Sequence, residues 1–263
     1  MKKARLIRKI PGDDEDRLST LPNCVLCYIL SFLDTKYVVQ TCVLSKRFKN
    51  LWSSLPYLNF DSTSFNKLFS FNKFVDRMLT LRDNSVRVDD FKFNRTGKIS
   101  SKFLDKVMNY AMSHCVLRFN IHVEYNGFDH FPESSYSSES LKSFELKIHG
   151  ELTKLPSFPE LKVLHLASVR LAHSDLVLSC PCLMDLALID CAAPKLDILN
   201  IDAPQLVKLT ISAGCFLSVC KVVVSAPGLA SFWYSGSHSL LLSILGELSS
   251  LEVVSIDVDR HHL

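Results

Sequence analysis

The sequence predicts an α/β protein in which a small helical module is followed by a solenoid with a curved parallel sheet. Two observations predict this architecture. An apolar frame of the form L-x-x-L-x-L recurs along the second half of the chain at a nearly constant interval. Before it, residues 17–60 carry apolar side chains at helical spacing between residues that cap helices. We therefore divide the chain into a disordered charged tail (1–16), the helical module (17–60), a helical linker (61–85) and a repeat array (86–263).

Four copies of the frame begin two residues after a proline. The steps between these prolines are 22, 23 and 23 residues, at Pro159, Pro181, Pro204 and Pro227. Looser copies extend the array to eight frames, which start at 88, 116, 141, 161, 183, 206, 229 and 251. Steps of 20 to 28 residues are typical of leucine-rich repeats, which generally bind other proteins. The last frame has no polar closing unit, so we expect the array to be cut short or to lean on a partner.

Alternation within the frame predicts which side chains are buried. Positions 4 and 6 are apolar and point to the same face of a short parallel strand. The segment that leads from one frame to the next is called a return. The returns at 199–204 and 222–227 have matching sequences, which indicate a second short strand or an extended run, ended by a proline. Only the return at 100–112 has a helical pattern. The asparagine that usually follows the inner strand is mostly missing, and Asp190 and Cys191 come closest to it.

Positions 3, 5 and 7 of each frame should face the concave side of the array, where a partner protein would bind. The substrate-binding candidates on this face are Glu145, His165, Asp185, Lys208, Thr210, Trp233 and Ser255. Their mixed charges disfavour a phosphate backbone and suit a folded protein or peptide. An exposed tryptophan among small polar residues is typical of a binding hot spot. The alternative is that the frame slips near Pro227 and Trp233 belongs to the core.

The helical module has the pattern of three short helices. Pro22 is well placed at the start of the first, Asp34 can cap the second, and Ser45 can cap a third that reaches Trp52. The segment carries more aliphatic side chains than three short helices can cover. We therefore expect a partner to complete its core.

This module resembles an F-box of the type found in plant F-box/leucine-rich-repeat proteins. The residues that carry the resemblance are Asp16-Arg-Leu-Ser-Thr-Leu21-Pro22, Ile29-Leu-Ser-Phe-Leu33, Val43-Leu44-Ser45-Lys46-Arg47 and Leu51-Trp52. The repeats extend it over nearly the whole chain. Phe48 departs from the family, which commonly has tryptophan there. Members often carry a further carboxy-terminal domain, and we expect this chain to stop before it.

The resemblance implies a function. F-box proteins dock onto the Skp adaptor of a cullin-type ubiquitin ligase and present a captured protein for ubiquitin transfer. The adaptor-binding surface that the resemblance implies comprises Leu21, Pro22, Leu26, Ile29, Leu30, Leu33, Val38, Val39, Val43 and Leu44. Several of these residues could instead hold the three helices together. An alternative function is a scaffold or competitor that binds the Skp adaptor without promoting ubiquitination.

The sequence carries no motif for catalysis, a cofactor or a metal. Cys24-x-x-Cys27 has no second pair at zinc spacing, and both cysteines fall in an aliphatic helix. The histidines are scattered, and the eight glycines form no phosphate-binding loop. We predict a non-enzymatic adaptor with no catalytic residue, no metal and no cofactor. An enzyme built on the cysteines is the alternative.

Charge and cysteine content indicate the compartment. The net charge of +3 is too small to imply an electrostatic partner. The basic cluster at 2–9 could be a nuclear address, a nucleic-acid contact or a solvated tail. The nine cysteines lie in apolar patterns, as in reduced intracellular proteins. No secretory signal or membrane-length apolar run is present. We expect a nuclear or cytoplasmic protein without nucleic-acid or membrane partners.

Overall fold

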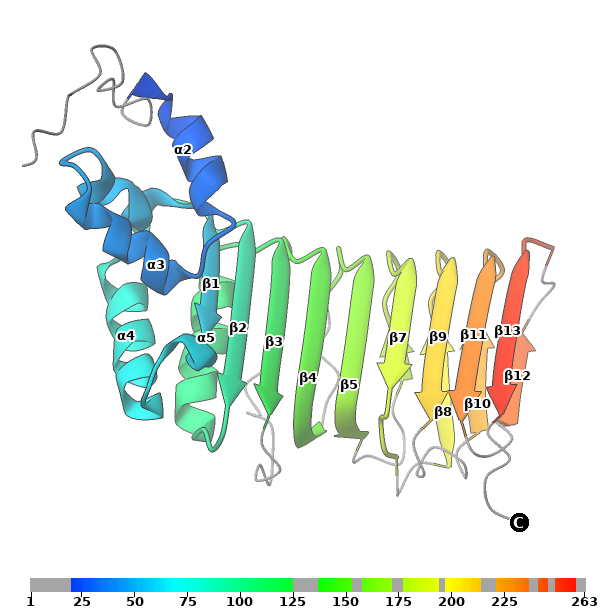
Figure 1. Ribbon diagram of the computed structural model, residues 1–263. Helices are drawn as coiled ribbons and strands as arrows, with labels where there is room; N and C mark the ends of the chain where they lie inside the picture. The colour runs from blue at the N-terminus through cyan, green and yellow to red at the C-terminus, as the bar shows by residue number, and fades with distance from the viewer. Residues whose placement is uncertain are drawn as a thin grey trace, which may run out of the picture.

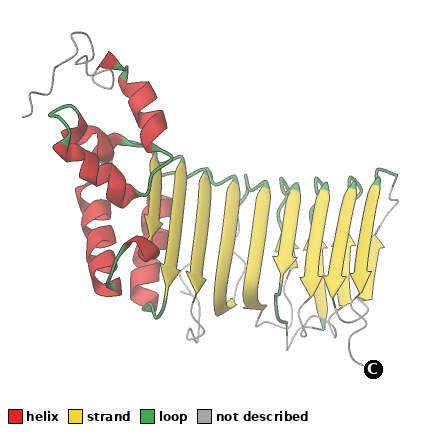
Figure 2. Ribbon diagram, viewed as in Figure 1, coloured by secondary structure: helices red, strands yellow, loops and turns green. Residues whose placement is uncertain are grey.

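The architecture is the predicted α/β solenoid with a helical module at its amino-terminal end. The computed structural model describes residues 20–124, 137–152, 158–171, 177–193, 197–213, 221–236, 241–245 and 249–258. The helices gather at one end and the strands fill the rest of the molecule (Figure 2). The predicted tail at 1–16 lies outside the described residues.

Three helical segments and a short turn form the helical module, as predicted. They are α2 (Asn23–Leu30), α3 (Thr35–Gln40), the 3-10 turn η1 (Thr41–Val43) and η2 (Phe48–Ser54). The Asp34 side chain caps α3 by accepting the N–H of Lys36 at 2.7 Å. The third helix is a 3-10 helix preceded by Arg47 rather than an α-helix capped by Ser45. The module has a small core of its own, made of Leu26, Leu30, Val38, Phe48, Leu51 and Leu55.

Nine parallel strands form the main sheet in chain order (Figure 1). They are β1 (Tyr57–Asp61), β2 (Asp90–Thr96), β3 (Arg118–Glu124), β4 (Ser143–Leu152), β5 (Val163–Leu171), β7 (Asp185–Ile189), β9 (Lys208–Ala213), β11 (Ser231–Gly236) and β13 (Val253–Val258). The predicted frames stack in register, so that Phe144 pairs with Leu164 and Leu164 with Leu186. Equivalent positions of successive repeats therefore form continuous rows across the sheet.

The returning segments cover one face of this sheet in two ways. Early returns are helices, α4 (Leu68–Leu81) and α5 (Ser101–Ser113), and α5 is capped by Ser100 as the pattern at 100–112 predicts. Later returns form a second parallel sheet of β6 (Val177–Ser179), β8 (Ile198–Asp202), β10 (Lys221–Ser225) and β12 (Leu241–Leu245). The predicted second strands at 199–204 and 222–227 are confirmed as β8 and β10.

The helix predicted within the linker at 61–85 is present as α4, and it packs into the core of the array. Asp61 ends β1, the short turn η3 (Ser62–Ser64) follows, and α4 packs into the main core through Phe71 and Val75. The array therefore begins with β1, directly after the helical module. A signal for this strand exists in the sequence, because Leu55, Leu58 and Phe60 fit the same apolar frame.

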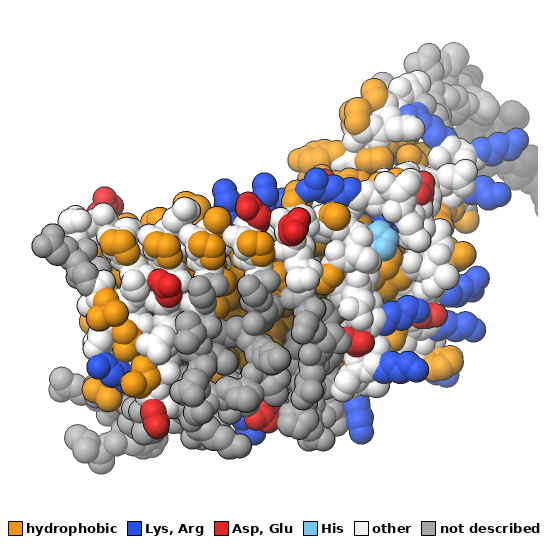
Figure 3. Space-filling view, turned by 180° about the vertical axis from the view of Figure 1, so that it is seen from behind, with side chains coloured by type: hydrophobic (Ala, Val, Ile, Leu, Met, Phe, Trp, Pro, Cys, Tyr) orange, Lys and Arg blue, Asp and Glu red, His pale blue; other side chains and the backbone are white. Residues whose placement is uncertain are grey.

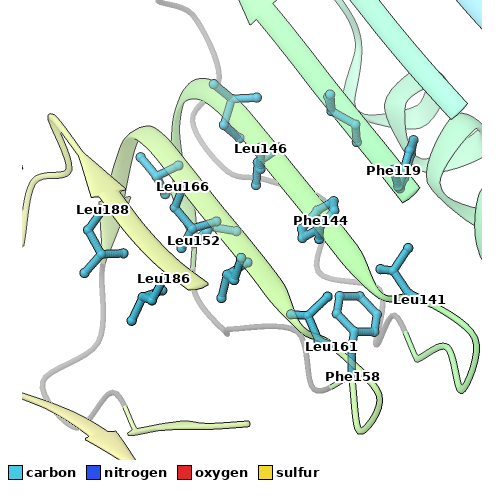
Figure 4. Close-up of a cluster of buried hydrophobic side chains, with 14 of the residues drawn as sticks. Phe119, Leu141, Phe144, Leu146, Leu152, Phe158, Leu161, Leu166, Leu186 and Leu188 are labelled. Carbon is cyan, nitrogen blue, oxygen red and sulfur yellow. The ribbon is translucent and has the colours of Figure 1, made fainter. Parts of the chain in front are cut away.

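The core is one continuous layer between the sheet and its returns. Side chains at positions 4 and 6 of the frames point into it, as Leu186 and Leu188 do (Figure 4). Near the helices, position 4 is a row of phenylalanines. Ring centroids lie 5.2 Å apart for Phe91 and Phe119 and 5.9 Å apart for Phe119 and Phe144. Such ring pairs add stability beyond the area they bury.

Cys191 occupies the position where leucine-rich repeats carry asparagine or cysteine. Its thiol is buried and donates to the carbonyl oxygen of Leu166 in the preceding repeat, 3.4 Å away. Burial raises the pKa of the Cys191 thiol to about 11. The residue before it, Asp190, takes a left-handed backbone with φ of 50°. Of Asp190 and Cys191, the two residues that come closest to the missing asparagine in the sequence, Cys191 makes the inward hydrogen bond.

Candidate functional site

Helix α2 has an inner and an outer apolar face. Leu26 and Leu30 point into the core of the helical module, whereas Val25, Tyr28 and Ile29 lie on the exposed side. Phe32, just beyond the helix, continues this outer stripe with 71% of its surface exposed, and its ring contacts Tyr28 edge-on at 5.0 Å. The spacing i, i+3, i+4, i+7 that normally marks a buried stripe is here turned to solvent.

Further apolar side chains on α3 and on the turn after it are exposed. Val43 is 88% exposed, and Leu44 and Tyr37 are also exposed. We define the module surface as Pro22, Val25, Tyr28, Ile29, Phe32, Leu33, Tyr37, Val43 and Leu44. Exposed apolar side chains are visible on the helical end in the view from behind (Figure 3). Contiguous apolar surface of this kind typically marks a protein interaction site.

The ten predicted adaptor-binding residues divide into three groups. Pro22, Ile29, Leu33, Val43 and Leu44 are exposed. Leu21 and Val39 are half-buried. Leu26, Leu30 and Val38 are buried in the module's own core, so these three hold the helices together in the isolated chain. Four further exposed residues lie outside the predicted set, although helical spacing marks the outer stripe of α2: Val25, Tyr28, Phe32 and Tyr37.

A charged clamp fixes the start of α2. The Arg47 guanidinium donates to the side-chain oxygen of Asn23, at 2.9 Å from Nε, and to the carbonyl oxygen of Leu21. This bond connects the turn before η2 to the first residues of α2, 24 and 26 residues earlier in the chain. The clamp thus holds the position of Pro22, between these two partners.

The helical module is joined to the array by several buried or half-buried contacts. The buried Arg82 guanidinium, at the end of α4, donates to the carbonyl oxygen of Leu55 at 2.8 Å. The Thr35 hydroxyl accepts the N–H of Asn59 in β1 at 2.8 Å. These contacts fix the direction of the module surface relative to the sheet.

The main sheet has an open face that the returns do not cover. We use this name for the residues at positions 3, 5 and 7 of the frames. All seven substrate-binding candidates lie on it, as the frame predicts: Glu145, His165, Thr210, Trp233 and Ser255 fall in one row, and Asp185 and Lys208 are neighbours in another. Their placement on one face is confirmed, and their role in binding stays a prediction.

Charged side chains form a connected group in the middle of the open face. His165 lies between two carboxylates, with Nε2 3.4 Å from Oδ1 of Asp185 and Nδ1 4.0 Å from Oε1 of Glu145. The other oxygen of Asp185 lies 3.4 Å from Nζ of Lys208. Glu145 also accepts a hydrogen bond from the Asn120 amide. The group contains both carboxylates and the ammonium of Lys208, so no single-sign patch is present here.

A shallow hollow of about 280 Å³ lies beside this group. Its lining includes Glu145, His165, Ala167, Ile189 and His122. The small side chain of Ala167 between longer neighbours accounts for the depression, because adjacent positions in a row lie side by side. Burial, followed by the nearby charge of Lys147, lowers the pKa of His122. The lining of the hollow thus combines polar side chains with the apolar side chains of Ala167 and Ile189.

Trp233 lies on the open face and does not belong to the core. It is 36% exposed, whereas its neighbours Phe232 and Tyr234 are buried. Its partners across the strands are Thr210 and Ser255. The alternative in which the frame slips at Pro227 is excluded by this register. An aromatic plate surrounded by small hydroxyl side chains is available for contact with a partner.

Across the described ranges, no group of three or more histidine, cysteine, aspartate or glutamate side chains is placed to hold a metal ion. None of the helices in those ranges has the length and apolar character needed to cross a membrane.

Comparison with known proteins identifies both regions. Residues 18–60 match the F-box domain family. The chain is 28% identical to F-box/LRR-repeat protein 13 of Arabidopsis thaliana over 96% of the chain and 58% of that protein. It is 30% identical to FBD-associated F-box protein At5g60610 of the same plant, over 94% of the chain and 65% of the relative. The chain thus spans about three fifths of the length of these two relatives.

A third relative is covered more fully. F-box/LRR-repeat protein At3g58900 of Arabidopsis thaliana is 30% identical over 84% of the chain and 73% of its own length. No solved structure matches the chain. The F-box match coincides with the helical module and reaches into β1. The similarity to the relatives continues through the repeats. The chain therefore belongs to the plant F-box/LRR-repeat family.

Proposed function

We propose that this chain is the substrate-recognition subunit of a Skp–cullin–F-box ubiquitin ligase. In this function the module surface docks onto the Skp adaptor, and the open face of the array binds the target protein. The observation that carries the proposal is the uncovered apolar surface of the helical module, joined firmly to a sheet with an open polar face. The ubiquitin chemistry belongs to other subunits, since proteins of this family are generally non-catalytic adaptors.

The exposed residues of the module surface supply the docking energy. Burying a large aliphatic or aromatic side chain fully contributes about 1.5–3 kcal/mol before association costs. Phe32, Val43 and Leu44 are the most exposed large apolar side chains of the module surface. Together they would contribute several kcal/mol to the complex. The carbonyl contact of Arg82 would then hold the array in a fixed direction from the adaptor.

The adaptor contact is tested with the double substitution Phe32→Asp and Val43→Asp. Both side chains are exposed, so the fold should persist, as circular dichroism would verify. We expect co-purification with the Skp adaptor to be lost, because two charges would be buried in an apolar interface. The matched control is Phe69→Asp on α4, which is 76% exposed and outside the module surface. Undiminished adaptor binding by the double variant contradicts the proposal.

The target contact is tested with Trp233→Ala. Mass spectrometry of proteins retained by the chain should show loss of specific partners, while Met184→Ala, an exposed residue outside the open-face rows, should leave them in place. If both variants retain the same partners, Trp233 is not part of the binding surface.

One measurement separates the ligase function from the scaffold or competitor function. In a ligase, cullin is present in the same complex as the chain and its adaptor, and turnover of the retained target depends on cullin. Adaptor binding without cullin would favour the scaffold.

A further inference from the structure

We propose that the hollow beside Ala167 and the indole of Trp233 together bind one extended segment of the target protein, with a carboxylate in the hollow and an apolar side chain on the indole. This inference rests on the proposed function and names the chemistry of its target. The hollow of about 280 Å³ is lined by residues of β3, β4, β5 and β7. Concave sites with a few polar groups among apolar ones are the usual form of a binding pocket.

The hollow arises where a small side chain interrupts a row of longer ones. Position 7 of successive frames is occupied by Lys147, Ala167 and Ile189, which pair across neighbouring strands. The methyl group of Ala167 leaves space between the side chains on either side of it. Just beyond this row, the β4–β5 ladder shifts register between Lys147 and Gly150, and Ser168 has a left-handed backbone with φ of 57°. Bulges of this kind are common next to functional sites.

The charges around the hollow leave one cation unpaired. Glu145 accepts a hydrogen bond from Asn120 and lies 4.0 Å from Nδ1 of His165. Lys147 is exposed, and among the residues that the structure describes no hydrogen bond or ion pair engages its ammonium. Its charge acts on the hollow, because after burial it is the largest cause that lowers the pKa of His122. A carboxylate that enters the hollow would therefore meet an ammonium with no competing partner.

Other classes of ligand fit the hollow less well. A cationic side chain would approach Lys147, and it would compete with Asn120 and His165 for the carboxylate of Glu145. A phosphate group carries about two negative charges, so Glu145 in the same lining would repel it more strongly than it repels one carboxylate. The apolar side chains of Ala167 and Ile189 suit the short aliphatic stem that carries a carboxylate.

Trp233 provides the second contact on the same face. β5, β7, β9 and β11 are consecutive strands of the sheet (Figure 1). At the usual strand spacing, and with the offset between positions 5 and 7 of the frame, Ala167 and Trp233 lie roughly 16 Å apart. Between them Ala187 is only 5% exposed and Thr210 is half-buried, so an extended backbone can cross there. About five residues of extended chain span this distance.

The test is a screen of the immobilised full chain with a library of random synthetic peptides of about ten residues, long enough to reach both contacts. We expect the selected peptides to carry a carboxylate about four to six residues from an aromatic or large aliphatic residue. The library is screened once with free carboxyl termini and once with amidated ones. The same motif in both screens assigns a side-chain carboxylate, and a motif found only with free termini assigns the terminal carboxylate.

Variants of the open face identify the two contacts separately. Lys147→Ala should weaken a selected peptide about 5-fold, as expected for one exposed ion pair. This loss should disappear when the peptide's own acid is replaced by its amide. Lys147→Glu should turn the preference from acidic to basic residues. Ala167→Leu should fill the hollow and remove only the acidic preference, whereas Trp233→Ala should remove only the apolar one.

The matched control is Lys162→Ala, an exposed lysine outside the open-face rows, which should leave both preferences unchanged. All the substituted side chains are exposed or half-buried, and thermal unfolding of each variant would verify that it folds. Selected peptides without acidic enrichment, or with basic enrichment on the wild-type chain, overturn the proposal. So does an acidic preference that survives Lys147→Glu, and so does a screen that selects no peptide.

These outcomes are distinct from a failure of the proposed function. That function is decided by adaptor docking, with the Phe32→Asp and Val43→Asp variant, and by cullin-dependent turnover. If docking and turnover hold but the acidic preference is absent, only the present inference fails. If the acidic preference is present but the chain does not dock onto the adaptor, the ligase function fails and the binding site on the open face stands.

Discussion

The first strands of the array and the later ones use the same apolar frame but cover it differently. β1 to β3 lie against helices α4 and α5, and each contributes at least one inward phenylalanine, such as Phe60, Phe91 and Phe119. From β7 onward the frame lies against a second sheet, and its inward row is mostly aliphatic. Both parts belong to one continuous core.

The difference shows that the frame specifies the strand and the return specifies the backing. A return with apolar residues at helical spacing, such as Leu104, Val107, Met108 and Ala111, places one amphipathic stripe on the sheet. A return with alternating residues, such as Val222 and Val224, forms a strand with a one-sided apolar face. Large rings fill the helix-backed part and make contacts with one another that aliphatic side chains do not make.

The largest expected effect comes from removing a ring from the helix-backed part. Phe91→Ala should destabilise the protein by about 3–5 kcal/mol, since Phe91 packs against Phe60, Phe119 and Tyr110. Leu209→Ala in the sheet-backed part should cost less, about 2–4 kcal/mol, because its cavity is smaller. Denaturant unfolding measures both values. An equal or greater loss for Leu209→Ala would show that the aromatic row adds nothing special.

A buried arginine is the next place where the two parts differ. Arg95 at the end of β2 is almost fully buried and donates to the carbonyl oxygen of Lys98 at 2.8 Å and to the side chain of Asn72 in α4 at 3.2 Å. Arg95→Met should cost about 1–3 kcal/mol, because part-buried carbonyls at 96–98 lose their donor. Hydrogen exchange should accelerate at 96–98.

The matched control for this change is Arg118→Met. Arg118 is exposed and its contact with Asp90 spans 3.2 Å at the surface. Exposed ion pairs contribute about 0–1 kcal/mol, so the control should be nearly neutral. A loss of the same size in both variants would argue against a special role for the Arg95 contacts.

A smaller effect is expected for Cys191, which stands in the sheet-backed part where leucine-rich repeats carry asparagine or cysteine. Cys191→Ala should cost about 1–2 kcal/mol through the lost hydrogen bond and side-chain packing, and Cys191→Asn should restore part of it. Because burial raises the pKa of the Cys191 thiol to about 11, this thiol should be inert to thiol reagents in the folded chain. The exposed Cys24 and Cys115 should react first. Rapid modification of native Cys191 would contradict its buried position.

The smallest expected effect is a pH dependence at the edge of the hollow. Burial and Lys147 lower the pKa of His122 in the folded state, so the unfolded chain binds a proton more readily. Stability should therefore decrease as the pH falls through about 6.5, the unfolded value, toward the lower folded value. Denaturation midpoints at neutral and mildly acidic pH should differ less in His122→Asn than in the parent. If stability falls more steeply with decreasing pH in His122→Asn than in the parent, the contribution of His122 has the opposite sign.

Much of this protein follows from short sequence patterns. The frame predicts eight of the nine main strands and the face of every open-face candidate, because side chains alternate in a strand with a period of two. Helical spacing predicts α5. Alternation of apolar residues predicts the returning strands β8 and β10. The first strand was missed because Leu55, Leu58 and Phe60 lie so close to the helical module that they were assigned to it.

Local periodicity is enough to predict the repeat, its inward and outward rows, and a small helical module rich in aliphatic side chains. Packing between the segments settles which of those side chains are core and which are surface, as for Leu26 and Ile29 on one short helix. It also places α4 in the core of the array. These outcomes depend on contacts between segments distant in the chain, and local periodicity contains no information about them.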